Sequence, residues 1–219
     1  KLKIIEDAAQ GLGAKFSQKN PGNFDSIACF SSHPMKILGC AGDGGFISTN
    51  SNLISEKLKI MRNHGQKNKY DYDSYGLSSR LDTLQAAILN VKFLTFDSVI
   101  KKRRRIASIY QNQLDGLPLA LPNKPSNKTF YDVYSSYVVR TKYQQKLYDY
   151  LRSKRIEVFI HLGPKPISEN KNLDFKIPYK LKKTNSYSKQ ILSLPIFPEL
   201  TDNQRKYVID SIKKFFKVI

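Results

Sequence analysis

Apolar and polar residues alternate along this chain in a way that predicts strands and helices following one another. Short apolar runs near residues 2–6, 26–31 and 44–49 predict strands. Helical spacing predicts one helix from Leu53 to Met61 and a longer one from Leu81 through Leu114, whose apolar face we expect to pack against a core. The residues of that face are Leu81, Leu84, Ala87, Ile88 and Val91.

A stretch rich in proline and polar residues interrupts this pattern from Leu117 to Pro125 and predicts a connection between two domains. The elements predicted after it are a strand at 134–140, a helix at 143–154, a strand at 157–161 and a helix at 202–216. This alternation in a short unit is typical of a small α+β domain. We therefore expect one domain over residues 1–116 and a small α+β domain over 117–219.

Composition excludes several classes of protein. Hydrophobic residues make up 40% of the 219 residues, with 13 Tyr and 12 Phe, which is enough for a packed core and excludes a disordered tail. No apolar run approaches the length of a membrane span, and the first residues do not resemble a signal peptide. The two cysteines, Cys29 and Cys40, make a poor disulfide framework and favour a reducing compartment such as the cytoplasm.

The chain is strongly basic, with 37 Lys and Arg against 18 Asp and Glu and a net charge of +19. Such a balance is typical of proteins that bind nucleic acid or an anionic surface. The basic residues are spread along the chain, however, and the tight cluster at residues 101–105 lies within a predicted helix, where a solvated helix face explains it. Nucleic-acid binding is therefore not favoured as the main role.

The most informative segment lies between the strands at 26–31 and 44–49. Ser31 and Ser32 leave the first strand, and Lys36 follows in a loop with glycines at 39, 42, 44 and 45. An amine at the end of a sheet could capture a carbonyl compound as a Schiff base if partial burial lowers its pKa. The glycines would let the backbone turn tightly and approach a ligand. The simpler alternative is that Lys36 is one more solvated lysine.

A second strand, ending in Asp7-Ala8-Ala9-Gln10, strengthens the interpretation. Together with the Ser31–Lys36 loop and Gly42–Gly45, it resembles the DegT/StrS family of pyridoxal phosphate (PLP) dependent sugar aminotransferases. Further blocks in family order are Arg62 to Gly65, Ser79 to Leu89, His161 to Pro166 and Leu194 to Leu200.

The resemblance also implies a fold and a place within it. Family members are markedly longer, and this sequence, which begins at Lys1 without methionine, resembles their C-terminal part. The implied fold is α/β, the fold type I of PLP-dependent transferases. Residues 1–116 would then end the large PLP-binding domain, and the missing part would carry other cofactor contacts.

The resemblance implies a role for each residue at the strand ends. Lys36 would form the Schiff base and carry the proton between substrate and cofactor carbons. Asp7 would keep the pyridine nitrogen protonated. Ala9 would pack against the ring, and Gln10 would donate to its hydroxyl oxygen.

Alternatives stand beside these roles. Ser31 would contact the phosphate, although Ser32 is an equally plausible hydroxyl. Asp7 could instead cap a helix, because Ala8 and Ala9 are good helix formers. Three histidines and two cysteines, scattered along the chain, make a metal site an unfavoured interpretation.

One departure from the family pattern concerns assembly. Members carry a Gly-x-Asn-x-Arg stretch whose asparagine reaches the cofactor phosphate of the neighbouring subunit, and here the stretch is Gly76-Leu77-Ser78-Ser79-Arg80. Ser78 replaces the asparagine, and its hydroxyl could still donate one hydrogen bond, with shorter reach. The resemblance therefore implies a homodimer with a shared active site, in which Ser78 is a candidate cofactor ligand.

Three hypotheses for function follow. The first is a PLP-dependent aminotransferase that moves an amino group from an amino acid, with glutamate the implied donor, to a keto sugar linked to a nucleotide, for polysaccharide or amino-sugar biosynthesis. An anionic nucleotide sugar would also suit the basic chain. The second is a PLP-dependent sugar dehydratase of the same family, in which histidine replaces the lysine, so Lys36 argues against it. The third is a non-enzymatic nucleic-acid-binding or regulatory protein.

Overall fold

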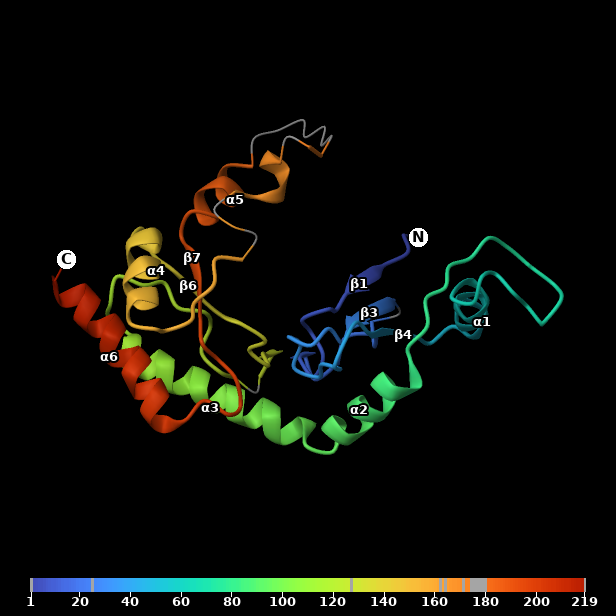
Figure 1. Cartoon of the computed structure of the whole chain (residues 1–219), viewed down its shortest axis with the longest axis horizontal. Coiled ribbons are helices and arrows are strands. Elements are labelled where there is room, and N and C mark those ends of the chain that lie inside the picture. Colours follow the sequence, from blue (N-terminus) through green and yellow to red (C-terminus); the bar gives the residue numbers. More distant parts are fainter. Residues whose placement is uncertain are drawn as a thin grey trace. The chain divides into compact units, whose positions relative to one another are not determined.

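The structure, a computed structural model, divides into two compact units. The first unit comprises Lys1–Lys101 and Ser126–Ser135, and the second comprises Lys102–Pro125 and Ser136–Ile219. The residues described are 2–24, 26–126, 128–161, 163, 165–170, 172–173 and 181–218. Figure 1 labels the elements along the chain.

A three-stranded sheet organises the first unit (Figure 1). The central strand β3 (Ile27–Ser31) pairs in parallel with β1 (Ile5–Asp7) and antiparallel with β4 (Gly45–Thr49). The predicted strands at 26–31 and 44–49 are confirmed, whereas the predicted first strand begins three residues later than expected. Two residues of β2 (Lys15–Phe16) pair with two of β5 (Phe130–Tyr131) in a separate ribbon that the pattern did not predict.

Along β3, buried side chains alternate with half-buried ones, and the buried side chains pack one face of the sheet. Ala28 and Phe30 are buried, and they form a cluster with Ala8, which directly follows β1. On β1 itself, the Glu6 carboxylate accepts hydrogen bonds from the Gly22 N–H at 3.2 Å and from the Ser26 hydroxyl. This carboxylate therefore ties the segment before β3 to the neighbouring strand.

A second core cluster lies beneath the loop that carries Lys36. Leu38 packs there with Phe96, Ile100 and Val133, and partly buried Leu89 lies against them. The cluster joins the lysine loop to helix α3 (Phe96–Leu114) and to the segment after β5. Burial of Leu38 two residues beyond Lys36 therefore fixes the direction in which the loop leaves the sheet.

The prediction of one long helix over 81–114 is wrong, because helix α2 (Thr83–Phe93) ends before α3 begins (Figure 1). The N–H of Leu94 donates to the Val91 carbonyl at 3.3 Å, and that of Thr95 donates to the Lys92 carbonyl at 3.2 Å. These bonds over three residues tighten the last turn of α2. The Thr95 carbonyl then accepts from the Val99 N–H and starts α3.

The predicted core face of this region is also wrong within the described chain. Leu84 is 70% exposed and Val91 is 68% exposed, so these two residues of the predicted face do not pack into a core here. Helix α1 (Asn52–Met61) confirms the helix predicted from Leu53. The Ser51 hydroxyl caps it by accepting from the Ile54 N–H at 3.4 Å.

The second unit contains an antiparallel pair, β6 (Tyr137–Arg140) with β7 (Ile191–Leu194). Its longer helices are the C-terminal part of α3, α4 (Gln144–Ser153) and α6 (Asp202–Val218). The two predicted helices at 143–154 and 202–216 are therefore confirmed. A short 3₁₀ helix (Ile167–Glu169) and α5 (Lys182–Tyr187) were not predicted.

Two predicted strands of this region are shorter than expected. The strand predicted at 134–140 begins at Tyr137, because Tyr134 adopts a left-handed conformation with φ of 51°. The strand predicted at 157–161 is reduced to one bridge between Phe159 and Ser193. Strand β7, which the pattern did not predict, supplies the partner for both segments.

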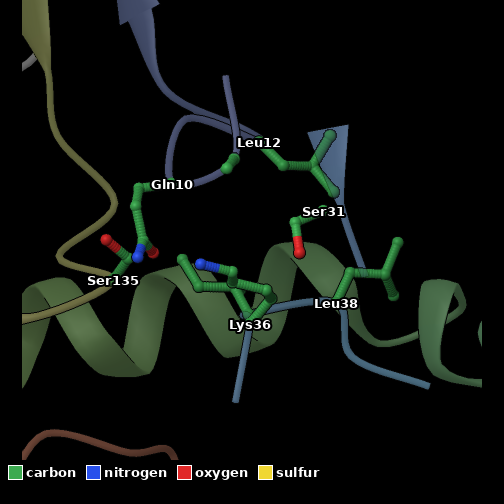
Figure 2. A pocket seen from close by; sticks show the side chains of 8 residues that line it. Gln10, Leu12, Ser31, Lys36, Leu38 and Ser135 are labelled. Atoms are coloured by element: carbon green, nitrogen blue, oxygen red, sulfur yellow. The ribbon is translucent and has the colours of Figure 1, made fainter. Parts of the chain in front are cut away.

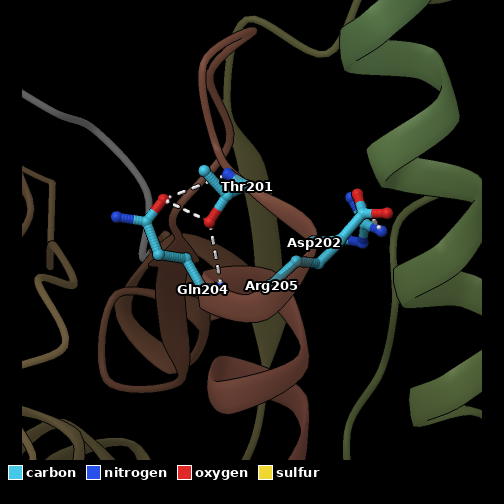
Figure 3. A network of polar contacts seen from close by, with 4 residues as sticks. All are labelled: Thr201, Asp202, Gln204 and Arg205. Carbon is cyan, nitrogen blue, oxygen red and sulfur yellow. Dashed lines mark hydrogen bonds and ion pairs between the residues drawn. The ribbon is translucent and has the colours of Figure 1, made fainter.

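Helix α6 begins with a reciprocal cap (Figure 3). The Thr201 hydroxyl accepts from the Gln204 N–H at 3.2 Å, and the Gln204 carboxamide oxygen accepts from the Thr201 N–H at 3.0 Å. Arg205 also pairs with Asp202 at 2.8 Å. The sequence Thr-x-x-Gln therefore sets the helix start by satisfying donors at both positions.

None of the helices in the described ranges combines the length and apolar character needed to cross a membrane.

The domain boundary expected between residues 116 and 117 remains a prediction about the whole protein. The candidate site residues from Asp7 to Ser78 all belong to the first unit.

Candidate active site

A small cleft opens where the chain leaves the carboxyl ends of β1 and β3 (Figure 2). Its empty volume, open solvent included, is about 220 Å³. The residues that line it are Ala9, Gln10, Leu12, Ser31, Lys36, Ile37, Leu38 and Ser135. Four of the six predicted site residues therefore meet in one place, although they come from two separate parts of the sequence.

Lys36 is half-buried at the wall of this cleft. Its backbone N–H donates to the His33 carbonyl at 2.8 Å and closes the first turn of the loop. Figure 2 shows its amine directed into the same space as the side chains of Gln10 and Ser135. The amine is therefore placed where a carbonyl group in the cleft could meet it.

The two serines that leave β3 point in different directions. Ser31 lines the cleft, and its Oγ accepts from the His33 N–H at 3.2 Å. Ser32 is fully buried, does not line the cleft, and its Oγ has no hydrogen-bond partner within the described structure. The alternation of side chains along an extended strand explains the difference. Of the two hydroxyls, Ser31 is the one that a ligand in the cleft would meet.

Asp7 ends β1 but does not line the cleft. Its Oδ1 accepts from the Ala9 N–H at 3.1 Å, and the Gly11 N–H donates to the Ala8 carbonyl at 2.9 Å. Successive turns follow Asp7 instead of an α-helix, so the alternative of a helix cap is wrong. The carboxylate closes the turn that delivers Ala9 and Gln10 to the cleft.

Ser78 lies elsewhere in the first unit and is exposed. It forms a bridge with Asn63, while the Ser79 N–H donates to the Arg62 carbonyl at 2.9 Å. Gly65 holds this arrangement, because a Cβ there would lie 1.7 Å from the Ser74 carbonyl oxygen. Ser78 is thus presented on a tightly packed loop and does not reach the cleft of its own chain.

The glycines of the lysine loop allow the tight folding that was one of the two expectations for them. A Cβ on Gly39 would lie 2.5 Å from the Pro34 carbonyl oxygen, and one on Gly45 would lie 2.6 Å from that of Phe30. Their approach to a ligand stays a prediction at both positions. They allow the chain's own backbone to pass closely, which makes the loop compact.

Of the four lining residues that the sequence did not predict as site residues, Ser135 is the polar one. It follows Tyr134, which is 2% exposed and has a positive φ, with its N–H donating to the Asp132 Oδ1 at 2.7 Å. A left-handed conformation is costly for a bulky residue and is tolerated where the surroundings enforce it. No local pattern announces this turn, which directs Ser135 into the cleft.

Metal-binding side chains do not gather in the parts of the chain that are described: no group of three or more His, Cys, Asp or Glu is found there. Both cysteines are free thiols. The cleft therefore presents an amine, hydroxyls and a carboxamide as its polar groups.

The sequence matches a known protein family. A sequence model of the DegT/DnrJ/EryC1/StrS aminotransferase family matches residues 1–213. The chain belongs to this family. Among its DegT/DnrJ/EryC1/StrS relatives, a Geobacillus stearothermophilus protein named pleiotropic regulatory protein is 36% identical over 99% of this chain and 59% of the relative. A Streptomyces venezuelae protein named dTDP-3-amino-3,4,6-trideoxy-alpha-D-glucose transaminase is 35% identical over 98% of this chain and 56% of the relative.

Solved structures of the DegT/DnrJ/EryC1/StrS family have a fold similar to that of this chain. The S. venezuelae DesV structure, a complex with a ketimine intermediate, matches with a TM-score of 0.93 and 34% identity over 100% of this chain and 59% of that one. A family member from Brucella abortus matches with a TM-score of 0.91 and 31% identity over 98% of this chain and 57% of that one. The predicted α/β fold, fold type I of the PLP-dependent transferases, is confirmed. The chain spans less than two thirds of the length of these relatives.

Proposed function

We propose that the protein is a PLP-dependent aminotransferase acting on a keto sugar linked to a nucleotide. The observation that carries the proposal is the half-buried amine of Lys36 in a cleft that it shares with Ala9, Gln10 and Ser31. Family membership supports the reaction type. A dehydratase of this family would carry histidine in place of Lys36, so the lysine favours amino transfer.

The polar groups of the cleft fit pyridoxal phosphate. A hydroxyl suits a phosphate oxygen, a carboxamide suits a ring hydroxyl, and an amine suits an aldehyde, and Ser31, Gln10 and Lys36 offer these three groups. In this proposal the chain segment supplies one wall of the site, because it covers only 56–59% of the relatives' length. The chemistry that the cofactor supplies when bound is an electron sink for the charge left on the amino-acid carbon.

Each residue of this chain then has a defined task. Lys36 would hold the cofactor through its amine and would carry the proton between the substrate and the cofactor. Asp7 would keep a proton on the pyridine nitrogen, and its bond to the Ala9 N–H sets the turn that leads into the cleft. Ala9 would pack against the ring, Gln10 would donate to the ring hydroxyl oxygen, and Ser31 would donate to the phosphate.

The proposed acceptor substrate is defined as a class. Relatives 33–35% identical are named for dTDP-linked and UDP-linked sugars that differ in the sugar itself. Similar identities to enzymes of different sugars support a nucleotide-linked keto sugar without selecting one. Glutamate is the proposed amino donor, and polysaccharide or amino-sugar biosynthesis is the proposed use of the product. The high positive charge suits an anionic substrate.

The proposed assembly is a cytoplasmic homodimer with a shared active site. Ser78 is exposed and outside its own cleft, as a residue that reaches a neighbouring subunit would be. Residues 1–116 are proposed as the end of the large PLP-binding domain and 117–219 as the small domain. Two free thiols fit a reducing compartment.

Covalent labelling tests the central assignment. The full-length protein is loaded with pyridoxal phosphate, reduced with borohydride and digested, and the labelled peptide is mapped. We expect the label on Lys36, its loss in Lys36→Ala, and its retention in Lys19→Ala, which changes an exposed lysine of the same unit. A label on another lysine, or no label in the wild-type protein, would remove the basis of the proposed function.

A further inference from the structure

Helix α2 contacts the loop that carries Lys36 through two side chains. The Gln85 Oε1 accepts a hydrogen bond from the Ala41 N–H at 2.8 Å. The Lys92 Nζ donates to the Gly39 carbonyl oxygen at 2.5 Å. The two side chains lie seven residues apart, close to two helical turns, so they project from one side of α2. The helix therefore holds one backbone donor and one backbone acceptor of the same loop.

This loop needs an external support at that point. Residues 39–45 contain four glycines, and glycine loses more conformational freedom on ordering than any other residue. Leu38 anchors the loop in the core before this stretch, and the Ser32 N–H donates to the Gly44 carbonyl after it. Between these anchors, Ala41 is exposed, and the Gln85 carboxamide supplies its N–H with a partner.

The Gln85 side chain also packs against the neighbouring glycine. A Cβ added to Gly42 would lie 3.2 Å from the Gln85 Nε2, which is tighter than most real contacts. Gln85 is itself half-buried, and its carboxamide is held by the bond from the Ala41 N–H. The Gln85 side chain therefore links the space available for a side chain at position 42 to the hydrogen bond with Ala41.

We infer that Gln85 is a positioning residue for Lys36: it holds the Ala41 N–H and so fixes the loop from which the amine reaches the cleft. The inference rests on the role proposed for Lys36. Displacement of a reacting group by about 1 Å can cost roughly 100-fold in rate, so a loop support remote from the chemistry can matter. Lys92, an exposed residue, acts on the same loop at Gly39 and is a second support.

Amide hydrogen exchange of the cofactor-free, full-length protein tests the support directly. Gln85→Ala removes the acceptor and keeps a good helix former, whereas Gln85→Glu keeps an acceptor oxygen. Loss of one hydrogen bond should speed exchange at Ala41 about fivefold in Gln85→Ala. Exchange should stay near wild type in Gln85→Glu and in Asn90→Ala, a control on an exposed amide of α2. Unchanged exchange in Gln85→Ala overturns the inference.

A second measurement links the support to Lys36. The rate at which pyridoxal phosphate becomes attached to Lys36 can be followed by the absorbance of the cofactor across pH. We expect this rate to fall several-fold in Gln85→Ala and to stay near the wild-type rate in Gln85→Glu. Gly42→Ala should slow attachment in the wild-type background and have less effect beside Gln85→Ala, because the crowded carboxamide is gone. Equal effects in both backgrounds, or no recovery in Gln85→Glu, count against the inference.

The two proposals fail in distinguishable ways. Absence of attachment at Lys36 in the wild-type protein contradicts the proposed function, and the exchange difference at Ala41 would still report whether Gln85 supports the loop. Normal attachment at Lys36 in Gln85→Ala, with faster exchange at Ala41, would leave the proposed function standing and overturn the positioning role.

Discussion

Tyr110 donates a hydrogen bond from its hydroxyl to the backbone carbonyl oxygen of Pro195, at 2.8 Å. Tyr110 lies on α3 and is fully buried, and its ring packs on that of Tyr137 with 5.1 Å between centroids. Pro195 directly follows β7, so this bond ties the strand pair of the second unit to the helix beside it. Tyr110 therefore combines a buried ring with a satisfied hydroxyl group.

Replacing this tyrosine should weaken the second unit. Tyr110→Phe keeps the ring but leaves the Pro195 carbonyl oxygen without its donor, which should lower the free energy of unfolding by about 1–2 kcal/mol. Urea unfolding measures the change. Tyr207→Phe is the matched control, because Tyr207 is 50% exposed and its hydroxyl bond to the Lys154 carbonyl is longer, at 3.3 Å, so its loss should cost less. Equal losses in the two variants would contradict this ranking.

Alkaline pH should destabilise the protein through the same residue. Burial raises the pKa of Tyr110 above its ordinary value of 10, the nearby Arg205 opposes this shift, and Tyr137 adds to it. Above pH 10 the unfolded chain loses this proton while the folded chain keeps it, so the free energy of unfolding falls as pH rises. We expect a smaller fall in Tyr110→Phe, measured by urea unfolding between pH 9 and 11. Identical slopes would show that other groups account for the dependence.

Asp7→Asn should separate the two tasks of this side chain. The asparagine Oδ1 can still accept from the Ala9 N–H, so the turn after β1 should persist. An amide cannot hold a proton on a pyridine nitrogen as a carboxylate does, so turnover should fall by orders of magnitude while some cofactor remains bound. Steady-state kinetics and cofactor absorbance of the full-length protein measure both effects. Near-normal turnover would mean that Asp7 serves the turn alone.

Ser78 provides a test of the shared active site. If its hydroxyl donates to a phosphate in the neighbouring subunit, Ser78→Ala should weaken cofactor binding by about 1 kcal/mol, and somewhat more if the acceptor is charged. Ser78→Asn should be tolerated or bind more tightly. Cofactor titration of both variants in the full-length protein decides the matter. Unchanged affinity for Ser78→Ala would mean that the contact is lost, and an active monomer at high dilution would exclude a shared site.

Local sequence patterns were sufficient for the elements that carry the cleft. The apolar runs of β3 and β4 and the glycine-rich loop between them predicted where Ser31 and Lys36 would lie. Side-chain alternation in a strand and the turn preference of glycine are properties of neighbouring residues, so they can be recognised from the sequence. The capping pair of Thr201 and Gln204 is equally local, and helix α6 begins where the pattern predicted.

The features that the sequence did not predict depend on the three-dimensional fold. The break between α2 and α3, at Leu94 and Thr95, carries no proline or glycine, so periodicity continued across it. Ser135 reaches the cleft because the fold enforces a left-handed Tyr134 almost a hundred residues after Lys36. Gln85 supports the lysine loop from 44 positions after Ala41. Such contacts depend on how elements pack in three dimensions, and nothing in the residues adjacent to either partner specifies them.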